Sequence, residues 1–270
     1  MSEPHLVTSI DGHVATMEFN RPEKRNALSV EMLEAMTGFV EAIASDPQVR
    51  CLVMSGRGGH FMSGGDVGGF AEALDQSPDQ RAVDFARRAR RALPVFAALE
   101  RFPGPIVAKV RGAVAGAGVG WVAAADIVLV SDTALFVFAH VHLGLSPDGG
   151  VTHFLPRLVG PRRAAEWLLL GKRIDAATAV SSGLATRLVA DDDLDRETQA
   201  LVEGLARGPV EALARTRRLL IDTFAHDRVE QMECEAAAFG ACAASSDFVA
   251  GVHRFIDRAK PGVVMNKERS

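Results

Sequence analysis

The feature that most constrains the fold is a short apolar strand that runs directly into a glycine-rich loop, and the chain contains this feature twice. Residues 51–55 (CLVMS) lead into the loop at residues 56–66 (GRGGHFMSGGD), and residues 106–110 (IVAKV) lead into a segment of small residues at 112–125. Because glycine has no Cβ, such a turn can bring free backbone N–H groups close to a polarised or negatively charged oxygen. The repeated strand, loop and helix pattern predicts an α/β core.

The segments around these loops also alternate between strand and helix. Residues 6–10 and 14–19 flank Asp11-Gly12, a dipeptide that tolerates the positive φ of a hairpin turn. Ser29 is a suitable N-cap, because apolar residues recur at helical spacing from Met32 to Ile43. We also expect a helix over most of residues 80–99 and strands at residues 127–130 and 135–138.

The C-terminal part of the chain has a different pattern. From about residue 191 to residue 259 it is almost wholly helical and rich in alanine, leucine and arginine. We therefore divide the chain into an α/β core at residues 1–195 and a helical C-terminal region at residues 196–270.

Composition limits the partners and the compartment. A chain of 270 residues with 48% apolar residues can bury a full core without disulfides or a metal. The net charge of −4 includes no basic stripe, so we do not expect nucleic acid as a partner. The 3 cysteines form no CxxC pair, which argues against a disulfide framework and a zinc site and favours a reducing cytoplasm. Neither a signal peptide pattern nor a membrane-spanning apolar run is present, so we expect a soluble cytoplasmic protein without a membrane partner.

Other proteins with glycine-rich loops fit the sequence less well. The segment Gly116-Ala-Gly118-Val-Gly120 resembles a dinucleotide fingerprint, but its third glycine would fall on Trp121, and no acidic residue follows about 20 residues later. The chain contains no GxxxxGK[ST] run, which excludes a P-loop. Neither Ser63 nor Ser146 lies in a GxSxG motif, so a serine hydrolase is also disfavoured.

Four segments carry a family resemblance. Residues 20–29 (NRPEKRNALS), 61–67 (FMSGGDV) and 105–118 (PIVAKVRGAVAGAG) resemble three successive motifs of the crotonase superfamily, which includes the enoyl-CoA hydratases and isomerases. Residues 143–160 are similar to the fourth motif. The resemblance covers nearly the whole chain in the right order. It implies a spiral of ββα units with a helical C-terminal region that forms trimers, as a homotrimer or a dimer of trimers. It also implies an acyl-CoA or enoyl-CoA thioester as substrate, with no cofactor besides the coenzyme A of that substrate.

The resemblance also assigns site residues. Arg25 and Ala27 would lie near the phosphates and adenine of coenzyme A. The path of the coenzyme would be lined by Ser63, Gly64, Gly65, Asp66 and Val67. The two N–H groups of the family's oxyanion hole map onto Ser63 and Ala117, where alanine replaces the usual glycine and keeps the N–H. These groups would stabilise a thioester enolate.

The residues of the hydratase reaction are absent. The two glutamates that similar hydratases use for acid–base chemistry fall on Gly120 and His140. Asp148 stands where dienoyl-CoA isomerases and 1,2-epoxyphenylacetyl-CoA isomerases have a catalytic aspartate and 4-chlorobenzoyl-CoA dehalogenase has its nucleophile. One carboxylate suffices to move a proton between two carbons of a dienolate. The resemblance therefore favours an enoyl-CoA isomerase with Asp148 as proton shuttle.

Several residues also have a plain structural interpretation. Asp148 in Pro-Asp-Gly-Gly could cap a helix, and Asp66 could cap the helix after the first loop. His140 could pack in an apolar strand or act as an acid/base partner. A zinc site built from His140 and its neighbours is disfavoured. The arginines at positions 87, 88, 90 and 91 form either a solvated helix face or a contact with coenzyme A phosphates.

Three alternative functions remain open. The first is an atypical enoyl-CoA hydratase that works through His140 and Asp148. The second is a dehalogenase or hydrolase that uses Asp148 as a nucleophile. The third is a non-catalytic acyl-CoA-binding homologue that has lost the glutamates and kept the trimer.

Overall fold

The computed structural model describes residues 3–259 and divides into two compact units, residues 1–206 and residues 207–270. The boundary predicted at residue 195 falls inside the helix α9 (Leu194–Ala206), which packs against the sheet of the first unit. Residues 260–270, at the end of the predicted C-terminal region, lie outside the described residues.

The first unit is built on a six-stranded sheet with the strand order β1-β2-β3-β4-β6-β9. Strands β1 and β2 form an antiparallel hairpin, whereas all the other neighbouring pairs of this sheet are parallel. A second sheet has three strands in the order β5-β7-β8. The strands are β1 (Leu6–Asp11), β2 (Val14–Phe19), β3 (Cys51–Gly56), β4 (Ile106–Val110), β5 (Ala113–Ala115), β6 (Ile127–Ser131), β7 (Leu135–Val137), β8 (Arg173–Asp175) and β9 (Arg187–Val189).

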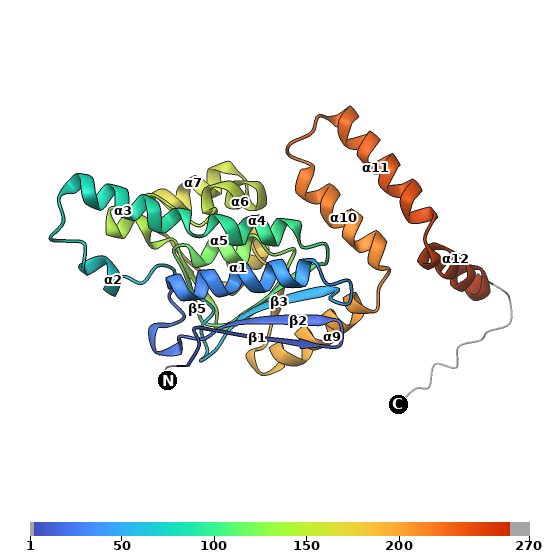
Figure 1. The fold of residues 1–270 in the computed structure, drawn as a ribbon, viewed down its shortest axis with the longest axis horizontal. Helices are drawn as coiled ribbons and strands as arrows, with labels where there is room; N and C mark the ends of the chain where they lie inside the picture. The colour runs from blue at the N-terminus through green and yellow to red at the C-terminus, as the bar shows by residue number, and fades with distance from the viewer. Residues whose placement is uncertain (1–2, 260–270) are drawn as a thin grey trace. The chain divides into compact units, whose positions relative to one another are not determined.

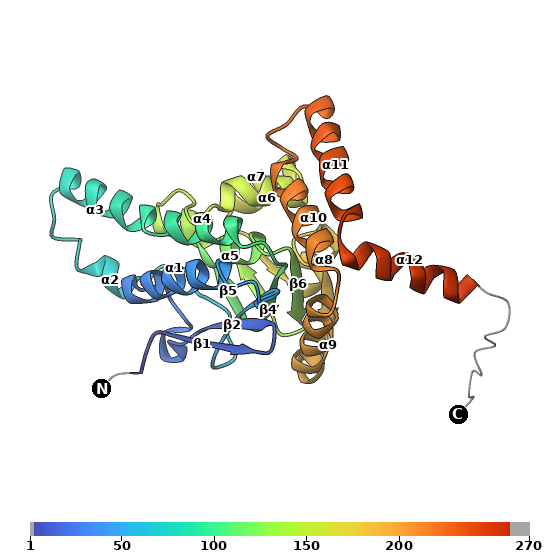
Figure 2. The ribbon, with the colours of Figure 1, turned by 45° about the vertical axis from the view of Figure 1, so that its right-hand side comes forward.

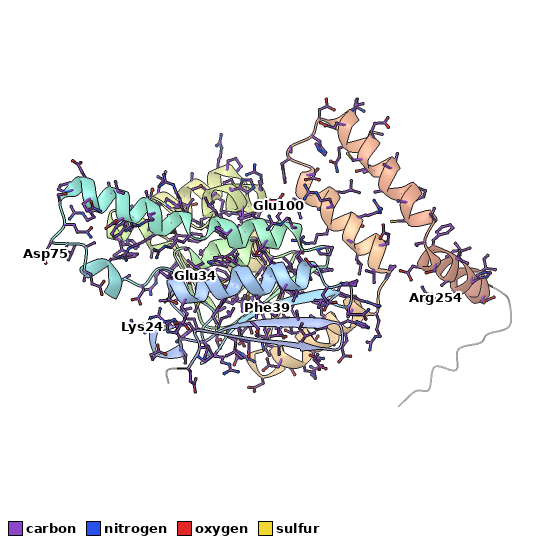
Figure 3. The ribbon with its side chains drawn as sticks, in the orientation of Figure 1. Lys24, Glu34, Phe39, Asp75, Glu100 and Arg254 are labelled. Carbon is purple, nitrogen blue, oxygen red and sulfur yellow. The ribbon has the colours of Figure 1, made fainter. Side chains whose placement is uncertain are left out.

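The hairpin and the first helix confirm the sequence predictions. Gly12 in the hairpin turn has a φ of +55°, a backbone conformation that favours glycine. The Ser29 hydroxyl accepts a hydrogen bond from the Met32 N–H at 3.1 Å and caps α1 (Val30–Ala44). Met36 of α1 is fully buried and Glu34 is exposed, so the helix is amphipathic (Figure 3).

The helix expected over residues 80–99 is two helices, α3 (Pro78–Arg90) and α4 (Leu93–Arg101). Pro94 lies in the first turn of α4, where a residue without an N–H is tolerated and cannot continue a preceding helix. The other helices of this unit are α2 (Gly68–Ala71), α5 (Gly118–Ala123), α6 (Val151–Val159), α7 (Pro161–Leu169), α8 (Ala176–Ser182) and the 3-10 helices η1 (Pro22–Lys24), η2 (Ala139–Leu143) and η3 (Asp191–Asp193).

The central strands bury both of their faces. Side chains alternate along a strand, so Leu52 and Met54 of β3 point to one face and Cys51 and Val53 to the other. The first face packs against α1 and α4, and the second packs against α9 through Leu194 and Val202 (Figure 1, Figure 2). Burial on both faces explains why these strands read as continuous apolar runs in the sequence.

Within the described residues, the second unit consists of α10 (Val210–Asp222), α11 (Arg228–Ala243) and α12 (Ser246–Ala259). Asp227 caps α11 by accepting hydrogen bonds from the N–H groups of Val229 and Glu230. Large apolar side chains remain exposed on these helices, including Phe239 at 78% and Phe255 at 76%. None of the described helices is long and apolar enough to cross a membrane.

Candidate active site

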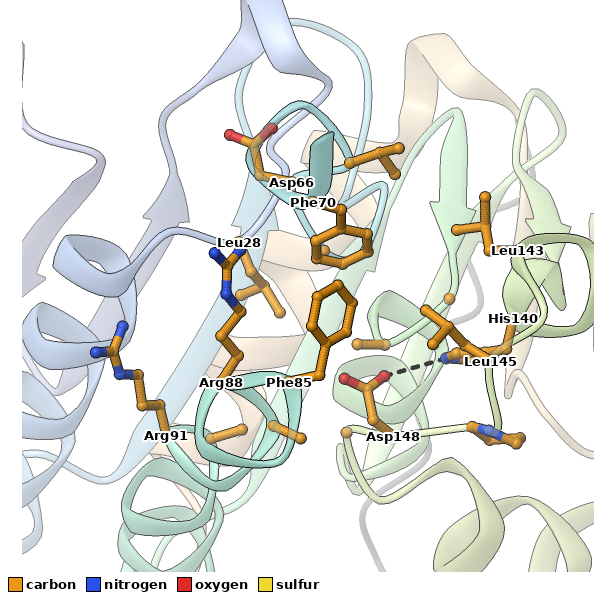
Figure 4. Close-up of a pocket in the computed structure, with 18 of the residues that line it drawn as sticks. Leu28, Asp66, Phe70, Phe85, Arg88, Arg91, His140, Leu143, Leu145 and Asp148 are labelled. Atoms are coloured by element: carbon orange, nitrogen blue, oxygen red, sulfur yellow. Dashed lines mark hydrogen bonds and ion pairs between the residues drawn. The ribbon is translucent and has the colours of Figure 1, made fainter. Parts of the chain in front are cut away.

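The first unit contains a cavity of about 650 Å³ into which both glycine-rich loops open (Figure 4). This volume lies within the range of small-molecule binding sites. Its walls come from the start of α1, from the two loops, from α3 and from the segment between η2 and α6. The lining residues include Leu28, Ser63, Gly65, Asp66, Val67, Phe70, Phe85, Arg87, Arg88, Arg91, Ala117, His140, Leu143, Leu145 and Asp148.

Backbone pairing holds the two loops together. Met62 of the first loop pairs with Val114 of the second, and Gly65 of the first loop pairs with Leu28, which precedes α1. Between these points Gly64 has a φ of +86°, and a Cβ there would lie 2.7 Å from the carbonyl oxygen of Ala115 and 3.3 Å from the nitrogen of Ala117. Only glycine fits this position, and its small size lets the two loops lie against each other.

The N–H groups of the two loops differ in their availability. The Ser63 N–H donates to the Arg25 carbonyl at 2.9 Å, and the Ser63 hydroxyl donates to the Lys24 carbonyl at 3.1 Å. Ser63 therefore has no free backbone donor, and its assignment to the oxyanion hole does not fit the structure. The N–H groups of Gly65 and Ala117, both in the cavity lining, donate no hydrogen bond to any residue that the structure describes.

Asp148 and His140 form a hydrogen-bonded pair in the cavity wall. The Nε2 atom of His140 lies 3.1 Å from Oδ1 of Asp148, as the dashed line in Figure 4 marks. The imidazole is 9% exposed and the carboxylate is 46% exposed. The histidine is thus fixed inside the protein, while the carboxylate reaches the cavity.

The alternative structural interpretations of these two residues are wrong. His140 lies in η2, not in an apolar strand, because β7 ends at Val137. Asp148 does not cap α6, whose N-cap is Gly150 without a side-chain hydrogen bond. The side chain of Asp148 is therefore available for another role.

The hydrogen bond between His140 and Asp148 can form with either tautomer of the imidazole. Its other ring nitrogen, Nδ1, is buried and has no hydrogen-bond partner among the described residues. If Nε2 carries the proton, it donates to the Asp148 carboxylate. If Nδ1 carries the proton, Nε2 can only accept one from a protonated Asp148. In both arrangements a single proton lies between the imidazole and the carboxylate.

Gly120 explains why the first hydratase glutamate is absent. A Cβ on Gly120 would overlap the carbonyl oxygen of Gly149, the residue after Asp148. Because this contact is with backbone, no side-chain rotation relieves it. A side chain at position 120 and the present position of the Asp148 loop exclude each other.

Asp66 has a different role from the predicted one. It caps no helix, because the N-cap of α2 is Val67 and has no side-chain hydrogen bond. Its carboxylate instead pairs with Arg21 at 2.9 Å and Lys24 at 3.0 Å. Burial alone would raise the pKa of Asp66, but the hydrogen bonds from Arg21 and Lys24 outweigh it and lower the pKa to about 2. Asp66 therefore holds the first motif against the second.

The residues predicted to bind coenzyme A divide into two groups. Ser63, Gly65, Asp66 and Val67 line the cavity, whereas Arg25, Ala27 and Gly64 do not. Arg25 is exposed and has a φ of +50°, and the neighbouring Ala27 is buried. These residues shape the loop next to the cavity.

Sequence reasoning missed a third wall. Arg88 and Arg91 were placed on a solvated face or at coenzyme A phosphates, and Phe70 and Phe85 were given no role. All four residues line the cavity. The two rings pack with their centres 4.9 Å apart and join α2 to α3. The spacing of residues 85, 88 and 91, which share one helix face, was the signal available in the sequence.

The described residues contain no group of three or more histidine, cysteine, aspartate or glutamate side chains that could hold a metal ion. His142 Nε2 lies 3.0 Å from the Gly171 carbonyl oxygen, so this ring nitrogen already has a hydrogen-bond partner within the protein.

Comparison with known proteins identifies the family. The family model "Enoyl-CoA hydratase/isomerase" matches residues 9–264. A Rhodobacter capsulatus protein named probable enoyl-CoA hydratase is 33% identical over 262 residues, 97% of this chain and 98% of its own length. The 1,2-epoxyphenylacetyl-CoA isomerase of Escherichia coli is 29% identical over 257 residues, 95% of this chain and 97% of its own length. The crystal structure of a Mycobacterium smegmatis enoyl-CoA hydratase has a TM-score of 0.86 and 29% identity, and the match covers 96% of this chain and 99% of that one. The predicted crotonase-like fold is confirmed, and the chain belongs to the enoyl-CoA hydratase/isomerase family of the crotonase superfamily.

Proposed function

We propose that the protein is an enoyl-CoA isomerase in which Asp148 moves a proton between two carbons of the acyl chain. The observation that carries this proposal is the difference between the two carboxylates of the cavity. Within the described residues, Asp66 and Asp148 are the carboxylates that line it. Asp66 is bound to two cations, whereas Asp148 pairs with a single side chain, the imidazole of His140. Asp148 is therefore the carboxylate that can accept a proton.

The backbone supplies the other half of the chemistry. We assign the oxyanion hole to the N–H groups of Gly65 and Ala117, in place of the predicted pair Ser63 and Ala117. When Asp148 removes a proton next to the double bond, negative charge develops on the thioester oxygen, and two fixed N–H dipoles stabilise it. One such donor contributes about 3 kcal/mol to lowering the barrier. The protonated Asp148 then returns the proton to the other end of the dienolate.

His140 supports this role as a positioning residue. Its buried imidazole holds one oxygen of Asp148 and leaves the other oxygen for the substrate carbon. The same hydrogen bond favours a second candidate, an enoyl-CoA hydratase in which the pair activates water. Hydration in the usual manner requires a second, separate acid/base group, and position 120 cannot provide it.

The first test follows hydrogen exchange and double-bond migration of 3-enoyl-CoA and crotonyl-CoA in deuterated water by NMR. We expect the wild-type protein to move the double bond with exchange at carbon, and Asp148→Asn to abolish both. Asp192→Asn, at an exposed position far along the chain, is the matched control and should behave as wild type. Addition of water to crotonyl-CoA by the wild type would favour the hydratase. Binding without any exchange would favour a non-catalytic homologue.

The assembly and the coenzyme A site complete the proposal. Coenzyme A, as part of the substrate, would lie along Ser63, Gly65, Asp66 and Val67, next to the loop that holds Arg25 and Ala27. The exposed rings of the second unit support assembly as a homotrimer or a dimer of trimers, since such side chains are normally covered in a stable protein. Sedimentation equilibrium tests this point, and a monomer would contradict it.

A further inference from the structure

Two arginines in the cavity wall lack an acidic partner. Arg88 near the end of α3 and Arg91 at its C-cap lie three positions apart and both line the cavity. Across the residues that the structure describes, no carboxylate pairs with either guanidinium. Their neighbour Arg87 lines the same cavity but pairs with Asp84 at 2.6 Å. The cavity therefore contains positive charge that the protein itself does not neutralise.

Arg88 is held in place by neutral groups. One terminal nitrogen donates to the carbonyl of Gly69 at 2.9 Å, and the guanidinium carbon lies 5.6 Å from the centre of the Phe85 ring. A guanidinium has five N–H donors, and this carbonyl uses one of them. The group is thus ordered and retains donors for an anion.

The position of the two arginines relative to Asp148 indicates which part of the substrate they meet. In Figure 4, Phe70 and Phe85 lie between the arginines and the His140–Asp148 pair. Leu143 and Leu145 line the cavity beside His140. An acyl chain with its reacting carbons at Asp148 would pass apolar side chains first and then reach the positive charge.

We propose that Arg88 and Arg91 bind a carboxylate at the far end of the acyl chain, so that the preferred substrates are ω-carboxyacyl-CoA thioesters. This inference rests on the proposed function of the same cavity. The other source of an anion is a phosphate of coenzyme A, but the predicted coenzyme A segment has an exposed cation of its own in Arg25. A planar guanidinium matches a carboxylate with two parallel hydrogen bonds, which makes a carboxylate a well-suited ligand for these side chains.

The test compares two saturated ligands that differ only at the chain end, adipoyl-CoA and hexanoyl-CoA, by titration calorimetry. Because neither ligand requires turnover, the result does not depend on the isomerase activity. We expect the wild-type protein to bind adipoyl-CoA roughly tenfold more tightly, the effect of one charge-assisted contact. Arg91→Gln should remove most of this preference. Arg90→Gln, an exposed arginine of the same helix outside the cavity lining, is the matched control and should keep it.

Arg88→Lys is a second variant, which keeps the positive charge but loses the planar guanidinium that can donate two parallel hydrogen bonds. We expect it to bind adipoyl-CoA with intermediate affinity. Equal affinities of the wild type for the two ligands would overturn the inference. An equal loss of affinity for both ligands and for free coenzyme A in Arg91→Gln would also overturn it, because the arginines would then bind phosphate. A preference for adipoyl-CoA without isomerisation of 3-hexenedioyl-CoA would support this inference and overturn the proposed function.

Discussion

Asp66 and Asp148 face the same cavity, yet their surroundings give them opposite properties. Asp66 is 25% exposed, and its Oδ2 atom pairs with both Arg21 and Lys24, which lowers its pKa to about 2. Asp148 is 46% exposed, and its recorded partner among the described residues is a single imidazole. A carboxylate bound to two cations stays ionised and acts as a clamp between two segments, whereas one held by a single imidazole is left for chemistry.

The largest expected effect comes from removing the free carboxylate. Asp148→Asn keeps the shape and a hydrogen-bond acceptor for His140 but cannot take up a proton. We expect kcat for double-bond migration to fall about 10³-fold, as for the loss of a general base, with the melting temperature unchanged. A spectrophotometric assay with 3-enoyl-CoA measures the rate. A variant with near wild-type kcat would assign the base elsewhere.

A structural test of the same region is Gly120→Ala. The added Cβ would overlap the Gly149 carbonyl, so the loop that holds Asp148 must move. We expect a loss of about 2 kcal/mol in the free energy of unfolding together with a fall in kcat. Gly204→Ala is the matched control, because a Cβ there meets no atom within 4 Å and alanine favours the α9 helix. Denaturant unfolding compares the two variants, and equal stabilities would refute the exclusion between positions 120 and 149.

A smaller effect is expected from the partner of Asp148. In His140→Ala the carboxylate loses the group that orients it, and a cavity replaces the buried ring. We expect kcat to fall about tenfold, the effect of one hydrogen bond to a charged group, with KM unchanged. His140→Gln, which can still donate to Asp148, should recover part of the rate. Equal rates in both variants would show that the ring fills space without positioning the carboxylate.

Local features of the sequence predicted the fold well, and long-range contacts set the limits of that prediction. The hairpin at Gly12 and the cap at Ser29 follow from neighbouring residues, and both were confirmed. The free donor of the first loop could not be read from residues 61–67, because the Ser63 N–H is used by a carbonyl of the distant residue Arg25. His140 was misplaced for a related reason, since the end of β7 is set by pairing with β8 and not by apolar character.

In the cavity walls, too, local sequence identified the residues, whereas long-range contacts decide what they do. The motif resemblance identified Asp148 but left its two roles, base or helix cap, equally compatible with Pro-Asp-Gly-Gly. The choice depends on whether a partner lies nearby, and His140 meets Asp148 only because η2 turns the chain back toward that loop. The arginines of α3 were recognised as a cluster. Which of them has an acidic partner depends on side-chain geometry, as the pairing of Arg87 with Asp84 shows.

The smallest effect should come from Asp66, the carboxylate that pairs with Arg21 and Lys24. The pH dependence of its contribution to stability distinguishes it from Asp148. The folded-state pKa of Asp66 is lowered from 3.8 to about 2, so its ion pairs stabilise the protein fully above about pH 4. This contribution is lost as the pH falls from 4 through 2, where the folded protein also takes up the proton. Asp66→Asn keeps one acceptor for Arg21, so we expect a loss of about 1 kcal/mol at pH 6 and almost none at pH 2. Urea unfolding of wild type and variant between pH 2 and 6 measures the difference. If the difference persisted at pH 2, the carboxylate charge would not be the source of the stability. If instead Asp66→Asn lowered kcat as strongly as Asp148→Asn, the assignment of clamp and base to the two carboxylates would fail.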